Sequence, residues 1–158
     1  MSTTVTTQTS PLEAWVRLYR GHAAALRDFN GSLSQEHGLT INDYEALLLL
    51  ANAPDRRLRP TDLAQTLQLT ASGVTRLLEG LEAGGYVERS ACPADRRVTY
   101  AVLTEAGVEK LRAASRSHVR EVEERLGALF DDSELATLVE LLGRLPGALP
   151  DRSCTVPR

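Results

Sequence analysis

Aromatic residues are scarce in this chain, whose 158 residues include one Trp, four Tyr and two Phe. With so few large rings, the core must be built mainly from Leu, Val and Ala, which favours helices over a β-sandwich. A chain of this length can bury its own core as a single compact domain. We therefore expect one domain with a mainly α fold.

Cysteine is also rare, and the two that are present, Cys92 and Cys154, lie far apart without a CxxC spacing. This spacing argues against a zinc knuckle and a disulfide framework, so both are most simply free thiols. The histidines His22, His37 and His118 do not form the i, i+4 pair of a preformed helical metal site. We expect no metal.

Long apolar runs are absent, since no stretch approaches the roughly 20 residues that span a bilayer. The polar start MSTTVTTQTS lacks the basic and apolar regions of a secretion signal. We find no nucleophile with a base, no phosphate-cradling glycine loop and no convincing pair of carboxylates. The sequence therefore predicts a cytoplasmic protein with no membrane partner, no cofactor and no enzymatic activity.

The net charge of −3 argues against a generally basic nucleic-acid binder. Between Arg56 and Arg97, however, seven arginines outnumber five acidic residues, so the middle of the chain is the part suited to an anionic partner. This charge asymmetry is mild and does not by itself indicate DNA binding, so a sequence motif is needed to support that interpretation.

Both ends of the chain carry long helical stripes of apolar and half-apolar side chains. Between Pro11 and His37 these residues recur at spacings of three and four, which predicts one long helix. Two further helices are predicted near the other end, with a break and an N-cap at Asp131 to Ser133. The terminal helices either pack within one monomer or interleave with a second copy, and the length of the stripes favours a homodimer. The stripes are Leu12, Trp15, Tyr19, His22, Leu26, Phe29 and Leu33; Val108, Leu111, Ser115, His118, Val122, Arg125 and Leu129; and Leu135, Leu138, Val139, Leu142 and Leu145.

Shorter helices are predicted between these ends. The stretch LTINDYEALLLLANA indicates a helix capped near Thr40 or Asn42. An arginine-rich connection from Pro54 to Pro60 follows, and then a short helix for which Thr61 is the expected cap.

The next helix, ASGVTRLLEGLEA, follows a tight turn, with Thr70 as its expected cap and the glycines at 84–85 as its stop. Its apolar residues share one side, while Ser72, Thr75 and Arg76 occupy the other. Two short helices joined in this way are typical of a helix-turn-helix, in which the polar face of the second helix reads DNA bases. Small hydroxyl side chains allow a close approach to the groove, and Arg76 can reach guanine or phosphate. An ordinary solvated face is the alternative.

A β-hairpin is predicted directly after this helix. The segments YVERS and VTYAVL have the extended, alternating character of a two-stranded ribbon, with CPADRR at its tip. A hairpin in this position is a wing, and an arginine at its tip can enter the minor groove of DNA. We expect Asp95 to orient Arg97 by charge-assisted hydrogen bonds, although Arg96 remains an alternative groove residue.

These segments resemble the MarR family of transcriptional regulators. LTINDYEALLLL is similar to the family's second helix, and DLAQTLQLTASGVTRLLEGLEAGGYVER is similar to its helix-turn-helix. DRRVTYAVLTEAG carries the family's wing pattern, here Asp95, Arg97, Leu103, Thr104 and Gly107. The resemblance implies a homodimeric repressor that binds double-stranded DNA at a pseudo-palindromic operator. Carried over to this chain, it implies that Thr70, Ser72, Thr75 and Arg76 contact the major groove and Asp95, Arg96 and Arg97 form the wing contact.

The resemblance also implies a domain organisation. Residues 1–158 would form a single MarR-like domain, mainly α with a small β-wing. The winged helix-turn-helix DNA-binding lobe would span 39–107. Dimerisation helices would span 11–37 and 105–146, and flexible tails would cover 1–10 and 147–158.

Family members often release DNA when a small, commonly aromatic and anionic ligand binds between the dimerisation helices and the DNA lobe. Trp15, Tyr19 and His22 share one face of the first helix and are candidate ligand contacts, although packing in a core is the commoner use of such a stripe. Cys92 would permit redox control, but it is more simply a solvated thiol. A winged-helix module that binds protein instead of DNA is a further alternative, which the presence of Arg76, Asp95 and Arg97 disfavours.

Overall fold

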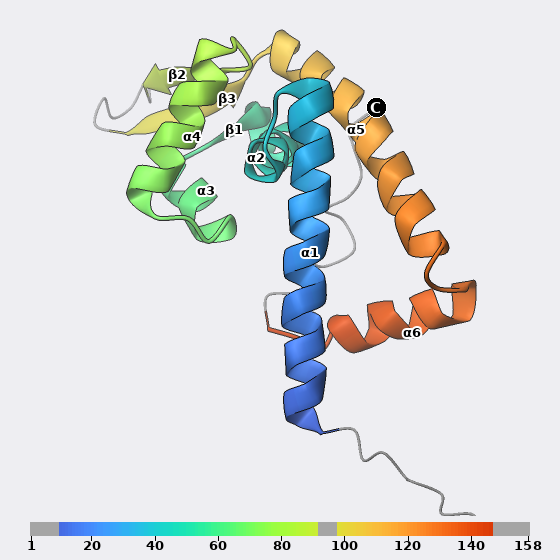
Figure 1. Cartoon of the computed structure of the whole chain (residues 1–158). Helices are drawn as coiled ribbons and strands as arrows, with labels where there is room; N and C mark the ends of the chain where they lie inside the picture. Colours follow the sequence, from blue (N-terminus) through green and yellow to red (C-terminus); the bar gives the residue numbers. More distant parts are fainter. Residues whose placement is uncertain (1–9, 92–97, 147–158) are drawn as a thin grey trace, which may run out of the picture.

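The computed structural model describes residues 10–91 and 98–146, which form six α-helices, one 3₁₀ turn and three short strands (Figure 1). The predicted tails lie outside the described residues, apart from Ser10. In chain order the elements are α1 (Pro11–His37), α2 (Ile41–Asn52), η1 (Pro54–Arg56), β1 (Arg57–Leu58), α3 (Pro60–Thr66), α4 (Ala71–Ala83), β2 (Val87–Ala91), β3 (Thr99–Leu103), α5 (Glu105–Gly127) and α6 (Asp132–Leu142).

This architecture confirms the mainly α fold with a small β-wing. Strands β2 and β3 pair antiparallel, with Val87 opposite Leu103 and Ala91 opposite Thr99, as expected for the hairpin. Strand β1 adds an antiparallel edge to β3, so the sheet order is β1-β3-β2. We did not predict β1, because a two-residue strand in an arginine-rich connection has no pattern to reveal it.

Side-chain caps fix the beginning of most helices. Thr40 forms a capping box with Asp43 at the start of α2, and Asp131 does the same with Glu134 at the start of α6. Thr70 accepts a hydrogen bond from the backbone N–H of Gly73 at 3.1 Å and so caps α4 as predicted. The predicted cap at Thr61 is wrong, because α3 already begins at Pro60. Proline suits the first helical position, since its ring sets φ and the missing N–H has no partner there.

The core lies between the helix-turn-helix and the inner halves of the long helices. Leu47 and Leu50 of α2, Leu63 of α3, Leu78 of α4 and Leu111 of α5 are at most 1% exposed. Ala101 and Leu103 of β3 close this core from the sheet side. The alternation expected in VTYAVL is confirmed in the second half of this segment, where Ala101 and Leu103 are buried while Tyr100 and Val102 are only half-buried; Thr99, on the same face as the buried pair, is exposed.

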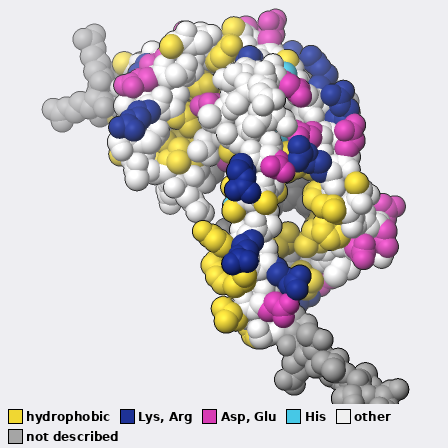
Figure 2. All heavy atoms as spheres, in the orientation of Figure 1, with side chains coloured by type: hydrophobic (Ala, Val, Ile, Leu, Met, Phe, Trp, Pro, Cys, Tyr) yellow, Lys and Arg dark blue, Asp and Glu magenta, His cyan; other side chains and the backbone are white. Residues whose placement is uncertain are grey.

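The outer parts of the terminal helices contrast with this core. In Figure 1, α1 extends well beyond the lobe, and α6 turns off from the far end of α5. Leu12 and Leu129 are each 70% exposed, and α6 has no buried residue. Figure 2 shows hydrophobic side chains gathered on this part of the surface. Packing inside one monomer therefore covers only the inner half of the α1 stripe, where Leu33 is buried.

The start of α5 is tied to the end of α4. The Thr104 hydroxyl donates to the Gly85 carbonyl at 2.7 Å and accepts from the Gly107 N–H at 3.0 Å, and so also caps α5. A Cβ on Gly107 would lie only 2.2 Å from the Tyr86 carbonyl oxygen, a distance that no side chain tolerates. The Leu-Thr and Gly of the wing pattern thus have a packing role at this junction.

Candidate nucleic-acid interface and cavity

Helices α3 and α4 form the predicted helix-turn-helix. Gln68 takes a left-handed backbone conformation with φ of 54°, and the Leu69 N–H donates to the Ala64 carbonyl at 2.9 Å. These features reverse the chain within the four residues from 67 to 70. Helix α4 then packs against the core through Val74, Leu78 and Leu81. Its opposite face is consequently turned to solvent.

That outer face carries the polar residues singled out from the sequence. Ser72, Thr75 and Arg76 are all exposed, and their spacing puts them on neighbouring turns of α4. The Thr75 hydroxyl donates to the Ala71 carbonyl at 2.9 Å, and the Thr70 and Ser72 hydroxyl oxygens lie 3.1 Å apart. Each hydroxyl oxygen keeps lone pairs for a base or phosphate. Thr70 differs from the others, because capping already occupies its side chain.

Arg76 differs from several other arginines near the sheet. Arg89 pairs with Glu82 at 2.5 Å, and Arg56 pairs with Glu105 at 2.6 Å. Within the described residues, Arg76 forms no ion pair. Its five N–H donors can therefore form the bidentate contact with guanine that arginine commonly makes in the major groove.

The strands of the wing are described, but its tip is not. Asp95, Arg96 and Arg97, together with Cys92, lie outside the described residues, so the arrangement expected at the tip stays a prediction. At the base of the wing, sequence reasoning missed an arginine pair. The guanidinium carbons of Arg57 and Arg59 lie 5.1 and 5.8 Å from the centre of the Tyr100 ring. Their alternation along the chain was the available signal, because it puts both on one face of an extended segment.

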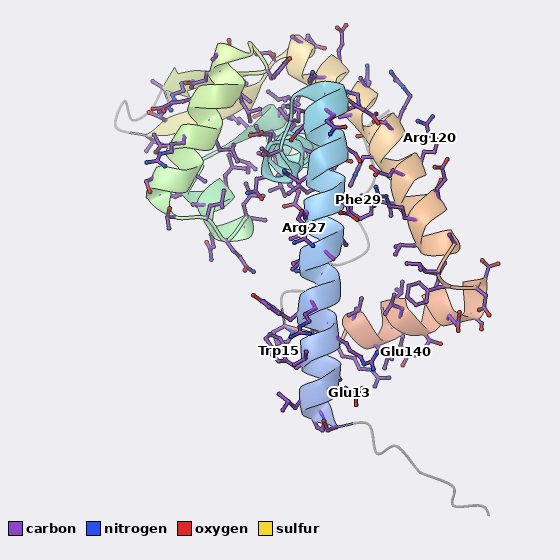
Figure 3. The ribbon with its side chains drawn as sticks, in the orientation of Figure 1. Glu13, Trp15, Arg27, Phe29, Arg120 and Glu140 are labelled. Atoms are coloured by element: carbon purple, nitrogen blue, oxygen red, sulfur yellow. The ribbon has the colours of Figure 1, made fainter. Side chains whose placement is uncertain are left out.

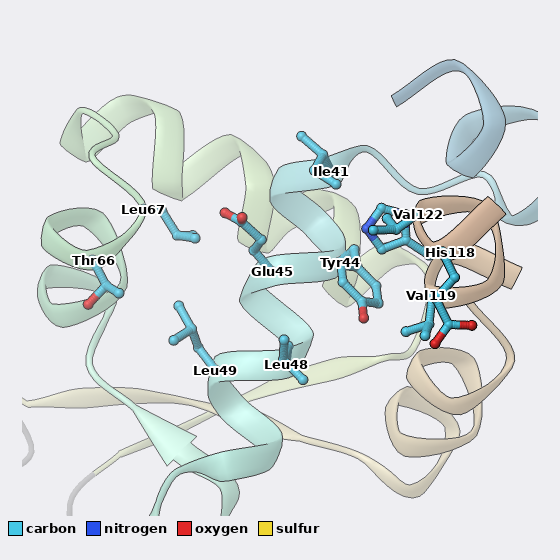
Figure 4. Close-up of a pocket in the computed structure, with 11 residues that line it drawn as sticks. Ile41, Tyr44, Glu45, Leu48, Leu49, Thr66, Leu67, His118, Val119 and Val122 are labelled. Atoms are coloured by element: carbon cyan, nitrogen blue, oxygen red, sulfur yellow. The ribbon is translucent and has the colours of Figure 1, made fainter. Parts of the chain in front are cut away.

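A cavity of about 330 Å³ lies between α2, α3 and α5 (Figure 4). Most of its walls are apolar. This volume is at the lower end of the range typical of small-molecule sites. The lining residues are Ile41, Tyr44, Glu45, Leu48, Leu49, Thr66, Leu67, His118, Val119, Val122 and Glu123.

Two titratable side chains of the cavity wall, Glu45 and His118, have features that bear on a ligand. Burial of the Glu45 carboxyl raises its pKa above the ordinary value. Burial lowers the pKa of His118, despite an opposing effect from Glu121, so its ring is uncharged at neutral pH. The His118 ring lies against Tyr44 and Phe29, with ring centres 5.0 and 5.4 Å apart, and its buried Nδ1 has no hydrogen-bond partner among the described residues.

The predicted ligand contacts Trp15, Tyr19 and His22 do not line this cavity. Trp15 projects from the lower part of α1, whereas Phe29 lies higher, where α1 meets α5 (Figure 3). The Trp15 and Tyr19 rings stack on each other at 6.2 Å, and both are at least 60% exposed. They are therefore not core residues of this protomer, and their role with a ligand stays a prediction.

The described ranges, 10–91 and 98–146, contain no group of His, Cys, Asp or Glu side chains that could hold a metal ion. No helix within these two ranges is long and apolar enough to cross a membrane.

Comparison with known proteins agrees with this geometry. A MarR family model matches residues 37–98. Sco3205, a MarR family transcriptional regulator from Streptomyces coelicolor solved in complex with DNA, is 32% identical, with coverage of 90% of this chain and 95% of that chain and a TM-score of 0.76. AbsC, a MarR family transcriptional regulator from the same organism, is 31% identical, with coverage of 87% and 93% and a TM-score of 0.74. The HTH-type transcriptional repressor YetL from Bacillus subtilis is 32% identical over 108 residues, which are 68% of this chain and 64% of that protein.

Proposed function

Because this chain belongs to the MarR family of DNA-binding transcriptional regulators, we propose that it acts as a homodimeric repressor of a pseudo-palindromic operator. The exposed Ser72, Thr75 and Arg76 face of α4 is the observation that carries the proposal. These relatives regulate transcription and are not enzymes, in agreement with the expectation from the sequence.

In the proposed complex, α4 enters the major groove and its exposed face contacts the bases. Arg76 provides the main discrimination through guanine, while Ser72 and Thr75 contact nearby bases or phosphates. At the wing, Arg97 enters the adjacent minor groove with Asp95 as its support, and Arg96 is the alternative if the hairpin turns one position differently. Thr70 acts chiefly by fixing the start of α4.

The exposed apolar parts of α1 and α6 support the homodimer. A second copy related by a two-fold axis would cover these faces and would present two lobes to successive major grooves. The half-sites would then lie about one helical turn of DNA apart. A repressor role is supported by YetL, whose name states that activity.

We also propose that binding of a small ligand causes the protein to release its operator. The cavity lies between α5, which belongs to the proposed dimerisation region, and α2 and α3 of the lobe. A ligand there would contact both regions, so it can favour one spacing of the two lobes over another. Such a preference is the thermodynamic requirement for release.

Arg76→Ala tests the α4 contact in a fluorescence anisotropy assay with DNA from upstream of the protein's own gene. We expect discrimination between the operator and scrambled DNA to fall by about 1–3 kcal/mol, because the bidentate base contact is lost. Arg112→Ala is the control, since Arg112 is an exposed arginine on α5. Undiminished discrimination in Arg76→Ala would overturn the assignment.

Arg97→Ala tests the wing contact in a salt series. Binding should weaken to all DNA sequences, and the salt slope should shrink by about 1, because one phosphate-region contact is lost. An unchanged slope in Arg97→Ala together with a reduced slope in Arg96→Ala would transfer the groove role to Arg96. No shift of upstream DNA by the unaltered protein at low salt would count against DNA binding altogether.

A further inference from the structure

The cavity between α2, α3 and α5 has an unusual charge pattern for a site expected to take an anionic ligand. Glu45 and Glu123 are part of its lining, whereas no Lys or Arg is. Neither carboxylate forms an ion pair with a described Lys or Arg. The one histidine of the lining is His118, and burial lowers its pKa, which favours the uncharged ring. Glu45 and Glu123 are both exposed overall, so the negative charge lies where the cavity meets solvent, with no described Lys or Arg paired to it.

Glu45 occupies the central position in this pattern. Its carboxyl points from α2 toward Leu67 of α3, across the cavity (Figure 4). Desolvation is the sole cause of its raised pKa, which means that no cation of the protein offsets the cost of burying the charge. A positively charged group in the cavity would restore the lost solvation by direct pairing.

An anion would meet the opposite situation. A carboxylate or phenolate bound in the cavity near Glu45 would bring a second negative charge close to a partly desolvated carboxyl, and the two charges would repel each other. It would also leave its own solvation shell without gaining an arginine or lysine partner. Tyr44 does not change this balance, because its hydroxyl lies 3.2 Å from the Ser115 hydroxyl in the protein interior.

The rest of the cavity wall is apolar and therefore favours a ligand with an apolar body. Leu48, Leu49, Val119 and Val122 line the cavity, together with the edge formed by Ile41. Burying an apolar group against these side chains is favourable at about 25 cal/mol per Å². A small hydrophilic cation such as a metal aquo ion would leave these walls unused.

We propose that this cavity binds a lipophilic cation, an apolar molecule with one protonated amine, which places the amine at Glu45 and its apolar body against Leu48, Leu49 and Val119. The inference rests on the proposed function only for the consequence that binding releases the operator. It replaces the anionic ligand expected from the family resemblance by one of opposite charge.

Isothermal titration calorimetry with three ligands of one ring system tests the charge preference on the full chain. The probes are 2-naphthylmethylamine, 2-naphthylmethanol and 2-naphthoate, which are cationic, neutral and anionic at neutral pH. We expect the amine to bind about tenfold more tightly than the alcohol, because charge-assisted hydrogen bonds are the stronger class, and the carboxylate to bind more weakly than both. Equal or tighter binding of the carboxylate, or no binding of the amine, would overturn the proposal.

Isosteric variants test the location. Glu45→Gln should lower the affinity for the amine while leaving that for the neutral alcohol unchanged, because only the charge is removed. Glu109→Gln is the matched control, since Glu109 is exposed on α5 and does not line the cavity. If Glu45→Gln retained the full preference for the amine, the cation would bind elsewhere and the proposed site would be wrong.

A separate measurement distinguishes this proposal from the proposed function. Operator binding is measured without ligand and then with the amine at saturation. Charge-selective binding of the amine by a protein that does not bind DNA would support the cavity and overturn the repressor role. Operator binding by a protein that rejects the amine would do the reverse.

Discussion

The lobe at residues 39–107 and the terminal helices differ in how they use apolar side chains. All buried hydrophobic residues of the described chain lie between Leu33 and Ala114, within the lobe or on the helix ends packed against it. Trp15, Leu129 and Val139, by contrast, are at least 60% exposed. Isolated exposed leucines are normal on protein surfaces, but a continuous apolar face along two helices marks an interaction site.

This difference separates two kinds of stability. The lobe satisfies its own core within one chain, so its folding depends little on protein concentration. The outer parts of α1 and α6 lack such cover within one protomer, so under the proposed homodimer their stability depends on protein concentration. Ion pairs such as Arg125 with Asp28, at 3.1 Å, join only the inner part of α1 to α5.

The largest effect is expected from a cavity in the lobe. Leu47→Ala should reduce the free energy of unfolding by about 2–5 kcal/mol, because Leu47 is completely buried and its neighbours cannot close the space fully. Chemical denaturation followed by circular dichroism measures this loss. The matched change Leu12→Ala, at a 70% exposed position, should stay within about 0.5 kcal/mol when the protein is dilute. Similar losses in both variants would mean that one core supports both regions.

A smaller loss is expected at the junction between the regions. Gly107→Ala forces the new methyl group toward the Tyr86 carbonyl and the Leu103 side chain, which should cost about 1–3 kcal/mol. Gly127→Ala is the control on the same helix, because a Cβ there would meet no atom within 4 Å. The control should be neutral or slightly stabilising, given the helix preference of alanine. A tolerated Gly107→Ala would show that α5 can shift away from the wing.

The smallest effect, and the one most specific to the terminal helices, concerns Trp15. Trp15→Ala should weaken the proposed homodimer by about 1–2 kcal/mol, because buried aromatic anchors dominate interfaces of this type. Sedimentation equilibrium measures the dissociation constant. Protomer unfolding, measured at a dilution where dimers are absent, should be unchanged. A dimer of undiminished stability would place the interface on another face of the chain.

Local chemistry explains why much of this fold was predictable from the sequence. Helix α1 begins and ends at the predicted residues, because Pro11 suits a first helical position and Gly38 takes a left-handed conformation, with φ of 65°. Thr70, Asp131 and the glycine stop after α4 are equally local signals. The predicted cap at Thr61 was wrong because both Pro60 and Thr61 are residues that commonly stand at the start of a helix, and α3 begins at the proline.

The cavity was not predictable in the same way. Its walls come from α2, α3 and α5, which are separated along the chain, and nothing in the local pattern around Glu45 or His118 indicates that they share a space. The charge of a ligand site depends on which side chains converge there. Sequence periodicity reports the face of one helix, whereas convergence is a property of the packed structure.

The double role of Thr104 has a mechanical consequence. One hydroxyl group caps α5 and holds the Gly85 carbonyl, while the Thr104 N–H donates to the Tyr86 carbonyl at 3.0 Å. The end of α4 and the beginning of α5 are therefore joined rigidly and have little freedom to separate. Any tilt of α5 imposed at the cavity, about four turns further along this helix, must be carried to the C-terminal end of α4 as a movement of the same body.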